Sequence, residues 1–231
     1  RLGWPDGPIL MVGNDVEQDL IPAATLGLAT YHSLDITPSA NGFASTGRGR
    51  LAELRPWLEQ TDPAALLPVY SSSASLLAVL RSTPAALTGL LEPLAPDALT
   101  ARPTADEWSV TEILCHMRDV AREVDQPRIR QILSENAPFV PAQLPDDWAS
   151  VREYDKQDVA SALREFTFAR LETLTMLRDL EPAQWSRKAR HAILGPTTLQ
   201  ELVGFNAEHD RLHIQQVYAG LPHLQKEESS R

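Results

Sequence analysis

The sequence predicts a mainly α-helical protein in which a four-helix bundle follows a partial α/β segment. From about residue 75 onward, apolar residues recur three and four positions apart, which is the period of an amphipathic helix. Before residue 60, proline and glycine instead interrupt short apolar runs that alternate with polar turns. The chain has 231 residues, of which 43% are hydrophobic, so it is long enough and apolar enough to bury a core.

The first sixty residues are expected to contain one strand–helix–strand unit. The apolar run from Pro8 to Gly13 is bounded by turn residues, as in a short buried strand. The pattern then predicts an acidic turn over residues 14–19, a helix over residues 20–26 that ends at a glycine, and a second strand over residues 28–31. A loop over residues 35–50 and a short helix over residues 51–60 follow. One such unit needs further strands to bury its faces, so we assign residues 1–60 to an incomplete α/β segment.

Four principal helices are predicted after a linker over residues 61–74. Thr83 supplies a capping hydroxyl before Pro84, which opens the first helix, over residues 84–91. Two capping boxes, Ser109-Val-Thr-Glu112 and Thr198-Leu-Gln-Glu201, open two longer helices. A further helix is predicted over residues 157–180, after a proline-rich connection over residues 137–147. The bundle as a whole is assigned to residues 75–222, and residues 223–231 form a polar tail.

Charge and cysteine content argue against several classes of function. Lys and Arg total 21 against 31 for Asp and Glu, and the net charge of −10 disfavours binding to nucleic acid or to anionic membranes. No apolar run approaches the roughly 20 residues of a membrane span, and we expect no signal peptide. The single cysteine, Cys115, excludes an internal disulfide and favours a reducing cytoplasm, where we expect the protein to reside.

Three histidines fall on the apolar seams of two predicted helices. His209 and His213 are four residues apart, so they lie one turn from each other on the face that leucines bury at the start of the same helix. His116 lies on the seam of the helix that begins at Val110. Three neutral imidazoles that point into one bundle would hold a metal and leave a position open for water or substrate. His32, His191 and His223 are expected in loops or tails, with no assigned role.

The alternative to a metal site is that the three histidines merely pack in the core. A lone core histidine is more often a hydrogen-bonded packing residue than a ligand, but burying several polar groups without partners costs about 1–3 kcal/mol each. A divalent Zn, Ni, Fe or Mn ion would relieve that cost, and three imidazoles do not choose among these metals. Three nearby residues are candidates to support the metal or bind substrate: Asn206, Asp210 and Arg170. We expect the Arg170 guanidinium to extend to the surface.

The sequence around these histidines resembles a known family. The segment from Glu107 to Asp119, Glu-Trp-Ser-Val-Thr-Glu-Ile-Leu-Cys-His-Met-Arg-Asp, and the segment from Gly195 to His213 resemble the two halves of the DinB/YfiT-like superfamily signature. The resemblance covers about residues 75–220 and implies a DinB-like four-helix bundle with a divalent metal held by the three histidines. It also implies a metal-dependent hydrolase, or an enzyme that uses a low-molecular-weight thiol such as mycothiol or bacillithiol.

The opening segment resembles a different family. Residues 9–28 are similar to the fourth motif of haloacid dehalogenase-like (HAD) hydrolases, whose Rossmann-like domain binds magnesium through carboxylates that follow a strand. Asp15 and Asp19 would be the magnesium ligands, although Asn14 stands where many members carry an aspartate. The Asp-x-Asp-x-Thr nucleophile loop of that family is missing from this sequence. Residues 1–60 are then either the end of a truncated HAD-like domain or a degenerate remnant of one. We expect truncation, because Arg1 is not a natural start.

Three hypotheses for function follow. The first is a DinB-like metal enzyme, a hydrolase or a thiol-dependent transferase, that acts on a small molecule. The second is a HAD-like magnesium-dependent phosphatase of which only a fragment is visible. The third is a bundle that serves as a metal-free scaffold for a partner. A homodimer is also expected, because bundles of this type often pair helices between protomers.

Overall fold

The computed structural model describes residues 7–35, 42–92, 94–143, 145 and 147–221. The chain separates into two compact units, one formed by residues 5–78 and one that begins at Val79. The predicted polar tail, residues 223–231, and His223 lie outside the described residues.

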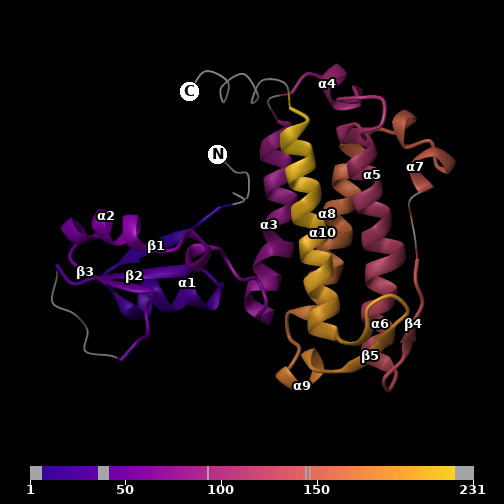
Figure 1. Cartoon of the computed structure of the whole chain (residues 1–231). Coiled ribbons are helices and arrows are strands. Elements are labelled where there is room, and N and C mark those ends of the chain that lie inside the picture. Colours follow the sequence, from indigo (N-terminus) through magenta and orange to yellow (C-terminus); the bar gives the residue numbers. More distant parts are fainter. Residues whose placement is uncertain (1–6, 36–41, 93, 144, 146, 222–231) are drawn as a thin grey trace. The chain divides into compact units, whose positions relative to one another are not determined.

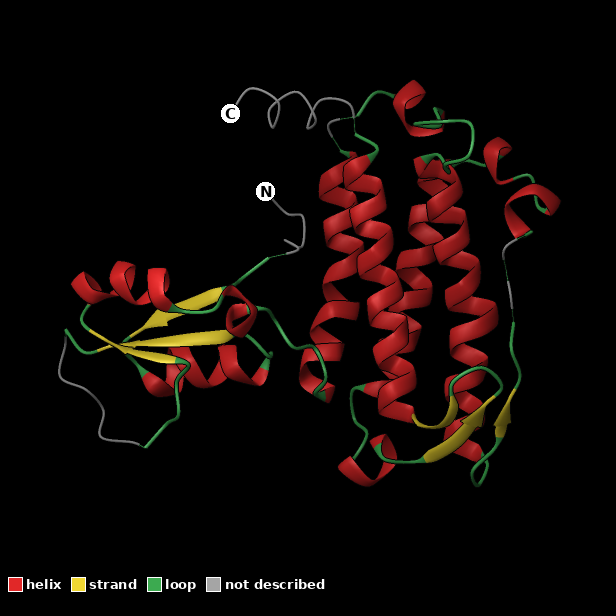
Figure 2. Cartoon of the chain, viewed as in Figure 1, coloured by secondary structure: helices red, strands yellow, loops and turns green. Residues whose placement is uncertain are grey.

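The first unit contains a three-stranded parallel sheet (Figures 1 and 2). Its strands and helices are β1 (Leu10–Gly13), η1 (Val16–Leu20), α1 (Ile21–Thr25), β2 (Ala29–Ser33), β3 (Gly47–Gly49), α2 (Leu51–Gln60) and η2 (Pro63–Leu66). The central strand β2 carries Tyr31, which is fully buried against the ring of Trp57 at 5.1 Å between centroids. The strand–helix–strand unit predicted from the sequence is therefore present, with a third strand beside it.

Some sequence predictions for this unit are wrong. Residues 16–19, expected in an acidic turn, form most of η1. Residues 47–49 were expected in a loop but form β3, because Gly-Arg-Gly carries no alternation of apolar residues that would reveal a strand. His32 was also expected in a loop, yet it lies in β2 and is 2% exposed. The extended conformations of residues 47–49 and of His32 depend on pairing with a neighbouring strand, which a local pattern does not encode.

The second unit is a four-helix bundle, shown in Figure 1 by α3 (Ser73–Leu91), α5 (Val110–Val120), α8 (Val159–Leu177) and α10 (Leu199–Ala219). A single π turn, η3 (Ala121–Asp125), joins α5 to α6 (Gln126–Ser134). The core draws apolar side chains from all four helices, among them Leu87, Leu114, Phe166 and Val217, each fully buried. The mainly helical class and the bundle predicted from the sequence are both confirmed.

Helix α3 begins at Ser73 and not at Pro84 as predicted, because Pro84 lies inside the helix. Proline breaks only one helical hydrogen bond there, and the buried hydroxyl of Thr83, expected to cap a helix, instead donates to Val79 O at 3.0 Å. With 19 residues and a mean hydropathy of 1.4 over its most apolar window, α3 is long and apolar enough to cross a membrane, contrary to the sequence prediction. Half of that window is buried inside the protein, as in the core helix of a bundle.

Short elements close the two ends of the bundle. They are α4 (Pro96–Thr100), β4 (Phe139–Val140), α7 (Trp148–Val151), η4 (Tyr154–Lys156), α9 (Pro182–Trp185), β5 (Lys188–His191) and β6 (Gly195–Thr198). Strand β5 pairs with β4 in parallel and with β6 antiparallel. His191, predicted to lie in a loop, therefore belongs to a strand, is 6% exposed, and accepts the backbone N–H groups of Ile193 and Leu194 through Nδ1.

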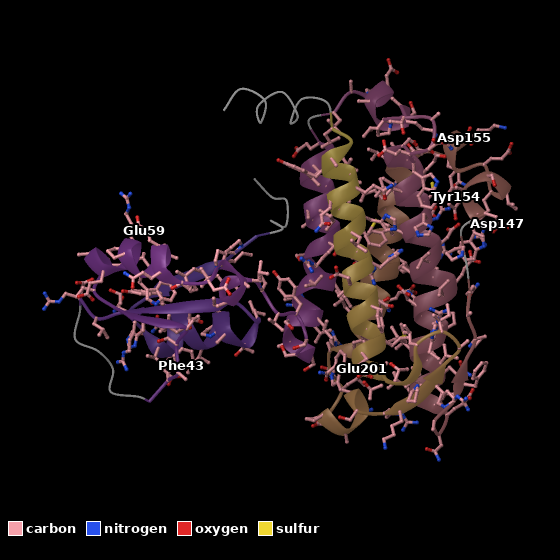
Figure 3. All side chains as sticks on the ribbon, viewed as in Figure 1. Phe43, Glu59, Asp147, Tyr154, Asp155 and Glu201 are labelled. Carbon is pink, nitrogen blue, oxygen red and sulfur yellow. The ribbon has the colours of Figure 1, made fainter. Side chains whose placement is uncertain are left out.

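One buried carboxylate fixes the long connection between α6 and α8 onto the bundle. Asp119 of α5 accepts hydrogen bonds from Arg118 Nε at 2.6 Å, Arg152 Nη1 at 2.7 Å and the Tyr154 hydroxyl at 2.8 Å. Figure 3 shows Tyr154 beside α5 in this connection. These bonds lower the pKa of Asp119 against the opposing effect of burial, so the carboxylate stays charged and holds both arginines.

Candidate metal centre

The two capping boxes predicted from the sequence set the start of both histidine-bearing helices. Ser109 Oγ accepts the backbone N–H of Glu112 at the start of α5, and Thr198 Oγ1 accepts that of Glu201 at the start of α10. In both boxes the glutamate side chain returns to the backbone N–H of the cap residue. Because the helix starts are fixed in this way, the faces that carry the histidines are fixed as well.

The three histidines come together between α5 and α10. His116 Nε2 lies 3.1 Å from His209 Nε2, which in turn lies 3.1 Å from His213 Nε2. Candidate ligand atoms of all three residues lie within 4.8 Å of one another. Among the described residues, no other group of three His, Cys, Asp or Glu side chains gathers in this way.

Hydrogen bonds alone do not account for this arrangement. A neutral imidazole nitrogen carries either one proton or one lone pair, so His209 Nε2 satisfies at most one of its two contacts. Two nitrogens bound to one ion, each about 2.1 Å from it and separated by about 90–110°, lie about 3.0–3.4 Å apart. The two observed separations of 3.1 Å fall in this range. The donor set therefore fits a divalent metal.

The local electrostatics keep the imidazoles neutral. Burial, reinforced by the neighbouring imidazoles, lowers the pKa of His116 to about 4 and that of His209 to about 3. Burial also lowers the pKa of His213. A neutral imidazole has a lone pair to offer to a metal, whereas a protonated one has none. The three residues are thus in the ligand form at neutral pH.

Two neighbours orient the histidine rings. Gln216 Oε1 lies 2.9 Å from His213 Nδ1, so it accepts the ring N–H and leaves the lone pair on Nε2. The Trp108 ring lies 4.9 Å from the His116 ring and is nearly parallel to the His213 ring at 6.4 Å between centroids. Trp108 and Gln216 also line a cleft of about 520 Å³ at the end of the bundle where α5 begins and α10 ends. Neither residue was assigned a role from the sequence, although the place of Gln216 on the seam was a usable signal.

The three residues predicted to support the metal contact a different part of the core. The expectation that Arg170 extends to the surface is wrong: its side chain is 1% exposed, and Nη2 donates to Asp210 Oδ1 at 2.6 Å. Asn206, with its amide nitrogen facing the acceptors, donates to Asp125 Oδ1 at 3.1 Å. Among the described residues, no hydrogen bond joins Arg170, Asp210 or Asn206 to a histidine of the cluster. Arg170 still acts on the site through its charge, which helps to lower the pKa of His209.

Asp125 is a buried residue that sequence reasoning missed. It is 4% exposed, and burial together with the charge of Asp210 raises its pKa to about 7. Asp125 lies four residues after Ala121 and eleven after Leu114, and both of these residues are fully buried. The helical period was therefore a usable signal for the burial of Asp125.

The two aspartates predicted to bind magnesium serve the backbone of the first unit. Asp15 caps η1, where its Oδ1 accepts the backbone N–H groups of Glu17 and Gln18, both at 2.9 Å. Asp19 Oδ2 accepts the backbone N–H of Asp15 at 3.1 Å. These contacts account for the position of both carboxylates without a metal.

Comparison with known proteins places the bundle in a family. The model of the DinB superfamily matches residues 80–217, which include all three histidines. The chain belongs to the DinB superfamily. The match lies within the second unit and leaves the HAD-like resemblance of residues 1–60 a prediction.

Two proteins of Bacillus subtilis show how this DinB chain compares with relatives. The solved structure of YfiT, described as a probable metal-dependent hydrolase with an unusual four-helix bundle topology, aligns with a TM-score of 0.58 and 20% identity, over 64% of this chain and 85% of that one. The uncharacterized protein YuaE of strain 168 is 20% identical over 138 residues, which are 55% of this chain and 85% of YuaE. At this identity the structural likeness establishes the fold.

Proposed function

We propose that the three-histidine centre binds one divalent metal and that the protein is a metal-dependent hydrolase or thiol-dependent transferase. The convergence of three imidazole Nε2 atoms supports the metal, because hydrogen bonding leaves one of their contacts unsatisfied. The description of YfiT as a probable metal-dependent hydrolase supports the reaction class. When bound, the metal would act as a Lewis acid and activate a water molecule or a thiol.

The residues of this chain would hold and orient that chemistry. His116, His209 and His213 supply three neutral ligands, so a divalent metal keeps its full charge and its remaining positions stay open. Gln216 fixes the tautomer of His213, and Trp108 shields one side of the rings from water. Cys115 is buried, and burial raises the pKa of its thiol to about 11, so a reacting thiol would have to come from a small molecule.

Metal analysis of the purified protein tests the first part of the proposal. We expect about one divalent metal per chain, lost in the double variant His209→Ala/His213→Ala. His191→Ala is the matched control, because it removes a buried histidine of the same bundle that is not in the cluster. A parent protein that stays metal-free after reconstitution would refute the proposal and favour the scaffold hypothesis.

Activity screens then separate the two reactions. Ester and amide substrates in buffer alone test hydrolysis, and electrophilic substrates with mycothiol or bacillithiol test thiol transfer. The proposal requires that the metal-loaded parent show one of these activities and that His209→Ala/His213→Ala lack it. A metal-loaded protein that is inactive in both screens would leave the metal site standing and remove the enzyme assignment.

A phosphatase in the first unit is a separate proposal with weaker support. It rests on the HAD-like resemblance of residues 9–28 and on the position of Asp15 after the parallel strand β1. It predicts magnesium-dependent release of phosphate that is lost in Asp19→Ala. The backbone contacts of Asp15 and Asp19 favour the structural alternative.

A further inference from the structure

Helices α3 and α8 enclose a second cleft within the bundle unit, lined by residues that differ from those of the metal centre. Its volume is about 310 Å³, at the small end of the range for ligand sites. Its lining consists of two arginines, two threonines and four apolar residues: Arg81, Arg170, Thr88, Thr167, Pro84, Ala85, Leu171 and Leu174. Among the residues that the structure describes, no carboxylate lines it, although acidic residues outnumber basic ones by 31 to 21 in the chain.

Arg170, which lines this cleft, has hydrogen-bond donors without a partner among the described residues. Its side chain is 1% exposed, and one of its nitrogens, Nη2, donates to Asp210. The other two nitrogens, Nε and Nη1, are buried and have no hydrogen-bond partner. Buried guanidinium N–H groups without an acceptor are unfavourable, so a ligand that brings an oxygen to Arg170 would stabilise the folded protein.

The charges around the cleft favour an anionic ligand. Asp210 already balances the charge of Arg170, with which it forms a fully buried pair. Arg81 is exposed and forms no ion pair with another described residue, so it supplies a second positive charge that is not yet balanced. The walls formed by Pro84, Ala85 and Leu171 are apolar and would contact a hydrocarbon chain.

We propose that the cleft between α3 and α8 binds a small carboxylate with a short aliphatic chain. The carboxylate oxygens accept hydrogen bonds from the free N–H groups of Arg170, and the charge of the ligand is balanced by Arg81. The aliphatic chain lies against Pro84, Ala85 and Leu171. This site uses no residue of the three-histidine cluster.

Binding of hexanoate to the full chain, measured by isothermal titration calorimetry, tests the proposal, with 1-hexanol as the neutral probe of the same chain length. EDTA is present throughout, so that a bound metal does not capture the carboxylate. We expect saturable binding of hexanoate, about tenfold or more tighter than that of hexanol, because only the carboxylate makes charge-assisted hydrogen bonds.

Two variants locate the site, and their folding is checked by circular dichroism. Ala85→Phe fills the cleft from an exposed position and should abolish binding, and Arg81→Met should weaken it about fivefold or more. Arg178→Met removes an exposed arginine at the end of the same helix α8 and should leave the affinity unchanged. Equal affinity for hexanoate and hexanol, unchanged binding in both Ala85→Phe and Arg81→Met, or no saturable binding would each overturn the proposal. In the last case a ligand in the cleft does not reach the buried nitrogens of Arg170.

Discussion

The buried ion pair between Arg170 and Asp210 allows a quantitative test of how the bundle core is held together. Both side chains are 1% exposed, and Arg170 Nη2 lies 2.6 Å from Asp210 Oδ1. Removing one partner of such a pair leaves a buried charge without compensation, which costs about 3–5 kcal/mol. Methionine keeps the apolar stem of arginine and removes its charge. We therefore expect Arg170→Met to lower the free energy of unfolding by about 3–5 kcal/mol.

The same substitution should make stability depend on pH through two carboxylates. Arg170 opposes the rise in the pKa of both Asp125 and Asp210 that burial causes. Without Arg170 both pKa values lie further above those of the unfolded chain, so the folded state binds protons more tightly. Such groups contribute stability at low pH, and this contribution is lost as the pH rises through the folded pKa. The free energy of unfolding that Arg170→Met loses relative to the parent should be smaller at about pH 5.5 than at about pH 8.

Urea unfolding followed by circular dichroism measures both effects, with EDTA present because a bound metal would raise the stability. With a slope of about 2 kcal/mol per molar urea, the expected loss moves the midpoint by about 1.5–2.5 M. Arg178→Met is the matched control. Its pair with Asp179 has side chains that are 62% and 79% exposed, so the loss should stay below about 1 kcal/mol.

The losses in free energy of unfolding of Arg170→Met and Arg178→Met are compared to test whether Arg170 and Asp210 form a buried ion pair. A loss for Arg170→Met at about pH 8 that is no larger than for Arg178→Met would refute the assignment of a buried pair. The double variant Arg170→Met/Asp210→Leu should recover most of the lost stability, because it replaces the pair with apolar side chains and leaves no lone charge.

Three further changes test the metal centre and its surroundings. Because burial depresses the pKa of His116 to about 4 and that of His209 to about 3, the unfolded chain binds protons that the folded chain does not below about pH 6.5. The metal-free protein should therefore lose this contribution between about pH 6.5 and pH 4, while Asp125 and Asp210 act in the opposite direction. The test is the difference in urea midpoint between the parent and His209→Ala/His213→Ala, which should fall over this range, and a difference that rises would contradict the burial of these rings. Gln216→Leu removes the acceptor of the His213 ring N–H and should weaken metal affinity by about 10- to 100-fold, whereas Gln216→Glu should preserve it. A competition titration with a chelator that finds the same affinity in both Gln216 variants would argue against this orienting role. Tyr154→Phe removes a buried hydroxyl that donates to a carboxylate of α5 and should lower the free energy of unfolding by about 1–2 kcal/mol. Urea unfolding checks this value, and an unchanged midpoint would mean that the hydroxyl contributes nothing.

The sequence alone was sufficient to predict where the helices that carry the histidines begin and which face of each helix carries them. The capping boxes at Ser109 and Thr198 set where α5 and α10 begin, because their hydrogen bonds span only three residues. From these starts, a period of 3.6 residues places His209 and His213 on one face of α10. Each of these inferences uses local geometry, which is why they could be made before the structure was known.

Local patterns were insufficient where a residue departs from a regular helix or strand. Pro84 was taken as the start of a helix, but it lies within α3, where burial of the helix in the bundle outweighs the loss of one hydrogen bond. The two-residue strand β4 is too short to show any alternation. The π turn η3 between α5 and α6 has no sequence signature of its own.

The tertiary structure decided which side chains meet. Arg170 and Asp210 are 40 residues apart, and only the packing of α8 against α10 brings them into contact, so the sequence left Arg170 free to reach solvent. The same packing leaves two nitrogens of Arg170, a residue that lines the α3–α8 cleft, without a hydrogen-bond partner in the described part of the chain. The sequence by itself determined the helical faces and the three candidate ligands. The partners of the buried charges depend on contacts between helices, which no single segment encodes.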